Sequence, residues 1–166
     1  TKSVKASQVD GLVDGNDIVN KFVDYFVSAS SNLTDEGSNK LKDNYAYKRS
    51  IYCGSPNSDA YNFDAELIDV IVHNMKRGKA AGLDSITVEH LLNCHPAIYT
   101  LLSKLFNLMI RNGFVPDDFG RSYTVPLPKC NAASKAMSTD DFRGISISPV
   151  LSKIFENCIL NRYREF

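Results

Sequence analysis

Basic residues and glycines gather in the segment 76–89, which reads Lys-Arg-Gly-Lys-Ala-Ala-Gly-Leu-Asp-Ser-Ile-Thr-Val-Glu. The two glycines allow the backbone to turn and to approach a ligand closely. The three cations Lys76, Arg77 and Lys79 suit a phosphate group. A second interpretation stays open, in which the glycines end one helix and the residues after them cap the next. The segment therefore indicates either a phosphate-binding loop or an ordinary connection between helices.

A lysine and an arginine lie in a predicted β-hairpin further along the chain. Residues 122–128 alternate in polarity and are rich in β-forming residues, and residues 142–147 are typical of a return strand. If the two strands pair antiparallel, Lys129 and Arg143 reach the same side of the hairpin. Together they could hold a triphosphate, the arginine through its planar fork. The alternative is a pair of solvated surface cations.

The residues needed for an independent active site are not apparent in the sequence. His73, His90 and His95 are scattered over predicted helices, where a single histidine is more often structural or solvated than catalytic. The carboxylate pairs 117–118 and 140–141 fall in predicted turns, whereas two-metal catalysis needs carboxylates on rigid neighbouring elements. No P-loop, nucleophile elbow or dinucleotide fingerprint occurs. We therefore predict no catalytic residue and no metal site within this chain.

Composition places the chain among ordinary globular proteins. Its 166 residues are 43% hydrophobic, enough for a core, and no apolar run approaches the roughly 18 residues of a membrane span. The four cysteines, at 53, 94, 130 and 158, form no close pair, which argues against zinc and against a disulfide framework. We expect reduced, intracellular thiols, with Cys158 in a core. The first residue is Thr1 rather than Met, so we also expect a longer parent protein.

Charge is unevenly distributed along the chain. Residues 1–75 carry 7 Lys and Arg against 11 Asp and Glu, while residues 76–166 carry 12 against 8. The second part is thus the better place to look for an anionic partner, although ordinary scatter of solvated charge explains the difference equally well.

Helices and one hairpin must position these residues. Hydrophobic periodicity predicts four main helices, which begin near Asn16 or Asp17, at Asp64, near Pro96 and near Ser148 or Pro149. We expect Gly78 and Gly82 to stop the second, and Gly113 the third. A short helix is predicted over 86–93, capped by Asp84 or Ser85, and another over 35–43 within a long connection, 28–62. The first dozen residues are polar and are expected to be mobile. The predicted fold class is α+β, mostly helical with a short antiparallel β-hairpin.

The segment 78–86, Gly-Lys-Ala-Ala-Gly-Leu-Asp-Ser-Ile, resembles the Gly-Lys-Ala-x-Gly-x-Asp-Gly-Ile motif that opens the polymerase region of non-LTR (LINE-type) retrotransposon reverse transcriptases. Four further matches follow in the order and spacing of that family, and the similarity covers roughly residues 64–166. They are Leu105–Asn107 with Gly113–Pro116, Val125–Lys129, Asp141–Ser146 and Ser148–Glu156. Departures within these motifs are mild, and the one that bears most on local geometry is Ser85 in place of the usual glycine, at the turn beside Asp84.

The resemblance implies the fingers and the preceding lead-in segment of an RNA-directed DNA polymerase, with residues 1–63 as an N-terminal extension and 64–166 as a partial polymerase domain. It assigns the triphosphate of the incoming dNTP to Lys129 and Arg143. It assigns the template to Lys76, Arg77, Gly78, Lys79 and Gly82. The partners that the resemblance implies are the RNA template, the DNA primer, dNTP, and the palm and thumb of the polymerase. It implies no membrane, and it implies a protein of the cytoplasm and nucleus.

The resemblance also implies a catalytic gap. The family's aspartates lie on the palm, partly in a Tyr/Phe-x-Asp-Asp turn, and no such sequence occurs in residues 1–166. This chain therefore needs no cofactor of its own, whereas the full-length parent enzyme would use Mg²⁺. Two hypotheses remain: an inactive portion of a polymerase, or a stand-alone transposon-derived module that binds nucleic acid or protein.

Overall fold

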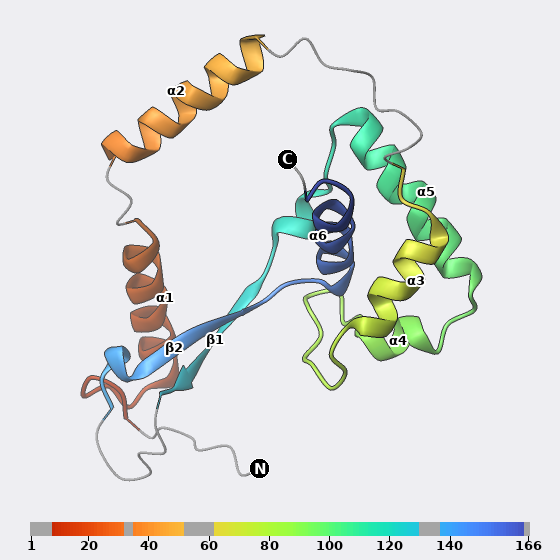
Figure 1. The fold of residues 1–166 in the computed structure, drawn as a ribbon. Helices are drawn as coiled ribbons and strands as arrows, with labels where there is room; N and C mark the ends of the chain where they lie inside the picture. The colour runs from red at the N-terminus through yellow and green to blue at the C-terminus, as the bar shows by residue number, and fades with distance from the viewer. Residues whose placement is uncertain (1–7, 32–34, 52–61, 130–136, 165–166) are drawn as a thin grey trace. The chain divides into compact units, whose positions relative to one another are not determined.

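The computed structural model describes residues 8–31, 35–51, 62–129 and 137–164. Within these ranges the chain is mostly helical and contains one two-stranded antiparallel sheet, which confirms the predicted proportions (Figure 1). None of the helices in these ranges is long and apolar enough to span a membrane. The elements in chain order are α1 (Gly15–Ser31), α2 (Asp35–Ile51), α3 (Ala65–Asn74), α4 (Val88–Leu92), α5 (Ala97–Asn112), η2 (Asp117–Gly120), β1 (Tyr123–Pro128), η3 (Thr139–Asp141), β2 (Phe142–Ile147) and α6 (Val150–Arg162).

The chain divides into two compact units, which are described separately below. Unit 1 comprises Thr1–Gly54 with Val125–Ile145, and unit 2 comprises Ser55–Thr124 with Ser146–Phe166. Each unit therefore takes two segments of the chain, and both strands of the hairpin begin in one unit and end in the other. These units are not the predicted domains. The predicted boundary between residues 63 and 64 marks the start of the partial polymerase domain, and it stays a prediction.

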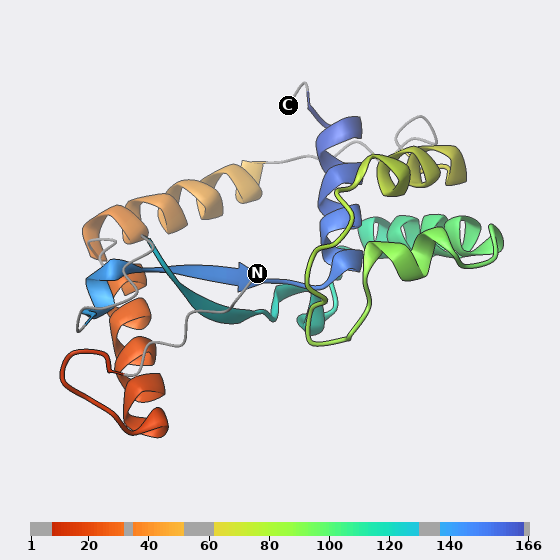
Figure 2. The same cartoon turned by 90° about the horizontal axis from the view of Figure 1, so that it is seen from below.

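Unit 2 is built on α3, which packs against both α5 and α6 (Figure 2). The side-chain oxygen of Asp64 accepts a hydrogen bond from the backbone N–H of Leu67, at 2.7 Å, and so caps α3 as predicted. Phe63, just before this cap, is 1% exposed and is fixed to α5 by three hydrogen bonds of its backbone, with Ser103 and Asn107. The main core of unit 2 contains Phe63, Ile68, Val72, Val88, Leu91, Tyr99, Leu102, Phe106, Met109, Val150, Ile154, Phe155 and Cys158.

Only part of the apolar stripe on α5 is buried. Leu102, Phe106 and Met109 lie in the core, but Leu101 is 60% exposed and Leu105 is 39% exposed. Part of the stripe stays exposed because it is wider than the surface that α3 and α6 cover. Gly113 ends the helix as predicted, in the left-handed conformation with φ 58°.

Unit 1 has a smaller core around the first helix. Phe22 of α1 packs against Phe142 of β2, edge to face with ring centroids 4.9 Å apart, and Val9 and Met137 complete the cluster. Val9 is 2% exposed, so the polar N-terminal stretch contains a buried anchor that the sequence analysis did not predict. The cap of α1 is Asp14, which accepts from the N–H groups of residues 16 and 17, rather than either of those residues.

Two helix boundaries differ from the predictions. Helix α2 extends to Ile51 instead of ending near residue 43, within a stretch expected to be mainly a connection. Helix α3 ends at Asn74, before Gly78, because Met75 adopts an extended backbone with ψ 143°. Between the two strands, the 3₁₀ turn η3 leads into β2, and residues 130–136 lie outside the described part of the chain.

The hairpin register follows from two contacts. The backbone N–H of Lys129 donates to the carbonyl of Asp141 at 2.7 Å, and the hydroxyls of Thr124 and Ser146 are 2.9 Å apart across the strands. Both contacts pair residues in the same antiparallel register. The two prolines of β1, at 126 and 128, therefore fall at positions whose missing N–H would point away from β2. This explains how a strand with two prolines can pair.

Candidate nucleic-acid interface

The loop between α3 and α4 holds the five residues predicted to contact a template. Gly78 has a positive φ of 69°, and its backbone N–H donates to the side-chain oxygen Oε1 of Glu89 at 2.5 Å. This hydrogen bond is the main cause that lowers the pKa of Glu89, and the nearby charge of Arg77 acts in the same direction. The loop is thus tied to α4 by a charged acceptor.

Gly82 fixes the other end of the loop. A Cβ atom at this position would lie 2.8 Å from the backbone Cα and N of Pro149, immediately before α6. The hydroxyl of Tyr123 also donates to the carbonyl of Ala81, at 2.9 Å. Gly82 is buried, so its role is close backbone packing rather than exposure to a ligand.

The cations of the loop face solvent. Lys76, Arg77 and Lys79 are all exposed, and none of them forms an ion pair with another described residue. The structure therefore brings the three predicted template-binding cations together on one ordered loop. The loop joins two helices, as the second interpretation predicts, and the phosphate-binding interpretation stays a prediction.

The turn at Asp84 has a conformation that a glycine at position 85 would favour. Ser85 has a φ of 59°, in the left-handed region, and its N–H donates to the carbonyl of Gly82 at 3.1 Å. The side chain of Asp84 accepts from the N–H of Ile86 at 3.1 Å, so it stabilises this turn and does not cap α4. Thr87 is the residue before α4, and its N–H donates to His90 Nδ1.

Lys129 and Arg143 project from one face of the hairpin. Lys129 is opposite Asp141, the residue before β2, and Arg143 follows two residues later, so side-chain alternation along the paired strands puts both cations on the same face as diagonal neighbours. Phe142, on the opposite face, is buried against α1, whereas both cations are exposed. In the structure the Lys129 ammonium donates to the backbone carbonyl of Asp140.

The face also carries a small polar network around η3. Hydrogen bonding to Asp140 is the main cause that raises the pKa of Tyr25, which lies on α1. The side chain of Asp141 accepts from the N–H of Ser138 at 3.0 Å. The Asp141 carboxylate therefore serves the local turn, as predicted, whereas the Asp140 carboxylate bonds to Tyr25 of α1.

The histidines and the other carboxylates have structural partners. His73 Nδ1 is 3.0 Å from Asp69 Oδ1, and His95 Nδ1 accepts from the N–H of Ala97. Asp118 lies in η2 and pairs with Arg121 at 3.1 Å. Across the part of the chain that the structure describes, no group of three His, Cys, Asp or Glu side chains could hold a metal ion.

The two cysteines within the described ranges differ in environment. Cys158 is buried as predicted, and burial raises the pKa of its thiol to about 12, while Cys94 is exposed. The other two, Cys53 and Cys130, lie outside the described residues.

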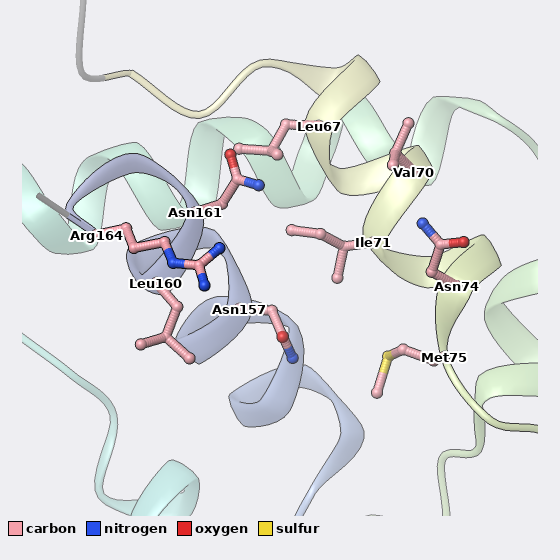
Figure 3. Close-up of a pocket in the computed structure, with 9 residues that line it drawn as sticks. All are labelled: Leu67, Val70, Ile71, Asn74, Met75, Asn157, Leu160, Asn161 and Arg164. Carbon is pink, nitrogen blue, oxygen red and sulfur yellow. The ribbon is translucent and has the colours of Figure 1, made fainter.

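Among the hollows in unit 2 are two of contrasting character, in addition to one of about 410 Å³ that is lined by residues of the Asp84 turn, of η2 and of the start of α6. One is a groove of about 720 Å³ between α3 and α6, with Leu67, Ile71 and Met75 on one side and three asparagines and Arg164 around it (Figure 3). The lining of this groove differs from the basic loop, because most of its lining side chains are apolar. The other, of about 160 Å³, lies beside the loop and is lined partly by Lys76, Lys79, Ser148 and Lys153. Ser148 and Lys153 were missed by the sequence analysis, since no local pattern indicates that the start of α6 meets a loop so far away in sequence.

Comparison with known proteins gives a partial match. No protein-family model matches the chain. A Drosophila melanogaster protein described as the 115 kDa protein in type-1 retrotransposable element R1DM is 32% identical over 98 residues, which make up 59% of this chain. The match spans 10% of that protein's length. The chain thus has a distant, partial similarity to a protein of an R1 non-LTR retrotransposon.

Proposed function

We propose that this chain is a portion of an RNA-directed DNA polymerase, the reverse transcriptase of a non-LTR retrotransposon. In this proposal it forms the lead-in segment and fingers, and it helps to bind the template and the incoming nucleotide. The similarity to the R1DM protein supports the retrotransposon origin. The palm and thumb, with their carboxylates and Mg²⁺, belong to the remainder of a longer protein. The chain alone is therefore expected to be inactive.

The hairpin register is the observation that carries the nucleotide-binding part of the proposal. In this register, side-chain alternation puts Lys129 and Arg143 on one exposed face, and this supports joint binding of one triphosphate. The ammonium supplies three donors, of which one is used by the carbonyl of Asp140. Arg143 supplies a planar fork that fits phosphate oxygens. The template is assigned to the exposed cations of the 76–79 loop, whose backbone is held to Glu89 and whose cations form no ion pair with a described residue.

Steady-state kinetics of the full-length polymerase test the nucleotide assignment. Charge-assisted hydrogen bonds are worth about 1.5–3 kcal/mol, so Arg143→Ala should lower kcat/KM for dNTP by about tenfold to a hundredfold. Lys129→Ala should act in the same direction, with a smaller effect. The matched control is Arg121→Ala, which removes an exposed arginine that pairs with Asp118 just before β1.

Template affinity should hardly change in the two hairpin variants. If Arg143→Ala leaves dNTP kinetics unchanged and weakens template binding instead, the two assignments are reversed. If neither property changes, Lys129 and Arg143 are solvated surface cations.

A further inference from the structure

Three lysines from two distant segments line one small cavity in unit 2. Lys76 and Lys79 belong to the loop after α3, and Lys153 is in the first turn of α6. Ser148 and Thr87 add hydroxyl groups, while Met75, Ala80, Ile86, Val88 and Val150 form the apolar part of the wall. The cavity therefore combines a cluster of positive charge with the hydroxyl of Ser148, whereas the Thr87 hydroxyl already bonds to Glu89 and lies 3.4 Å from His90 Nδ1.

The backbone holds the two sides of the cavity together. Gly82 lies directly against Pro149, the residue that precedes α6, and this contact leaves no space for a side chain. The loop is further fixed by the hydrogen bond from Gly78 to Glu89. These backbone contacts hold the three lysines near one another, although their like charges repel.

No described side chain balances the positive charge of the cluster. Within the described ranges, Lys76, Lys79 and Lys153 form no ion pair. The carboxylate of Glu89 is engaged by Gly78 and by the charge of Arg77. The N-terminal end of α6, a helix of 13 residues, adds partial positive charge where Val150 lines the cavity. Such a site favours an anion.

The cavity volume limits the size of that anion. Drug-sized ligands occupy pockets of about 300–1,000 Å³, whereas this cavity has about 160 Å³. We propose that it binds one phosphate group of a nucleic-acid backbone, with Lys153 of α6 as a third cation beside Lys76 and Lys79. The choice of a polynucleotide rests on the proposed function, whereas the phosphate chemistry rests on the cavity alone.

Binding of a fluorescein-labelled single-stranded RNA to the 166-residue chain tests this proposal. Lys153→Gln should weaken binding by about fivefold to tenfold near 0.1 M salt and reduce the slope of log affinity against log salt by about 0.7. Lys104→Gln is the matched control, because it removes an exposed lysine of α5 that is outside the cavity. Lys79→Gln combined with Lys153→Gln should cost less than the sum of the single effects, since both lysines would contact one phosphate. Circular dichroism of each variant checks that the fold is retained.

Inorganic phosphate separates the two sources of the ligand. If the proposal holds, phosphate competes with RNA for the wild-type chain and competes less for Lys153→Gln. If phosphate binding depends on Lys153 but RNA binding does not, the cavity takes free phosphate and the polynucleotide assignment is overturned. If Lys153→Gln matches Lys104→Gln in both assays, the cavity proposal is wrong. A loss of RNA binding in Lys76→Gln and Lys79→Gln alone would then leave the proposed template role intact.

Discussion

Substitution of Gly82 by alanine should destabilise unit 2, because the new methyl group would clash with the backbone of Pro149. Its Cβ would be 2.8 Å from two backbone atoms of Pro149, whereas ordinary contacts begin at 3.4 Å. The obstructing atoms are backbone, so no side-chain rotation relieves the clash. The loop and the start of α6 would have to separate by roughly half an ångström or more.

The magnitude follows from two opposing effects. Overpacking of this kind costs about 1–3 kcal/mol. Gly82 has no positive φ, so alanine can adopt its backbone conformation, and the smaller entropy of the unfolded chain returns about 0.4–1 kcal/mol. The net loss in the free energy of unfolding should be about 1–2 kcal/mol. For a chain of this size that lowers the thermal midpoint by about 2–8 °C.

Thermal unfolding followed by circular dichroism measures this loss, with Gly120→Ala as the control. A Cβ on Gly120 would meet no atom within 4 Å, and its φ is not positive, so that variant should be as stable as the wild type or slightly more stable. Equal midpoints for Gly82→Ala and Gly120→Ala would refute the argument that the loop needs a glycine for close packing.

Further predictions concern other parts of the chain. Ser85→Gly should stabilise the protein by about 0.5–1 kcal/mol, because it removes a left-handed non-glycine residue, and a lower denaturation midpoint would contradict this. In a background whose other two cysteines are replaced by serine, Cys94 should react with a maleimide at pH 8 while Cys158 reacts only on unfolding; equal rates in the native protein would contradict its burial. The groove of Figure 3 exposes Leu160, which is 65% exposed, so Leu160→Asp should reduce binding of a hydrophobic dye, and unchanged binding would show that another surface is responsible. The isolated chain should not extend a primer on an RNA template with dNTPs and Mg²⁺, and extension above a heat-inactivated control would disprove its dependence on a palm.

The sequence was most informative where apolar periodicity, caps and turns agreed. Asp64 and Gly113 mark the ends of helices that pack on a shared core, and the alternating hairpin residues follow the observed pairing. It was least informative for α2. From Gly37 to Ile51 every residue of this helix is exposed except Ser38, which is half-buried. A helix without a buried face has no hydrophobic stripe, so the periodicity that reveals the other helices is missing.

The candidate site was only partly predictable for a related reason. Lys76, Arg77 and Lys79 are neighbours in sequence, so their grouping on one loop could be predicted directly. Lys153 meets them only through the contact of Gly82 with Pro149, a tertiary feature that depends on where two backbones meet. The predicted cap of α4 was wrong for a local reason. The side chain of Asp84 bonds to the backbone of the preceding turn instead of to the first turn of the helix.

A double-mutant cycle on Lys129 and Arg143 tests the central claim that both cations hold one triphosphate. The measurement is kcat/KM for dNTP in the full-length polymerase, for the wild type, each alanine variant and the double variant. Two cations that contact the same ligand should be coupled, so the double variant should differ from the sum of the single effects by about 0.5–3 kcal/mol. Additive effects, or effects confined to template binding, would contradict the claim that the hairpin face binds the incoming nucleotide.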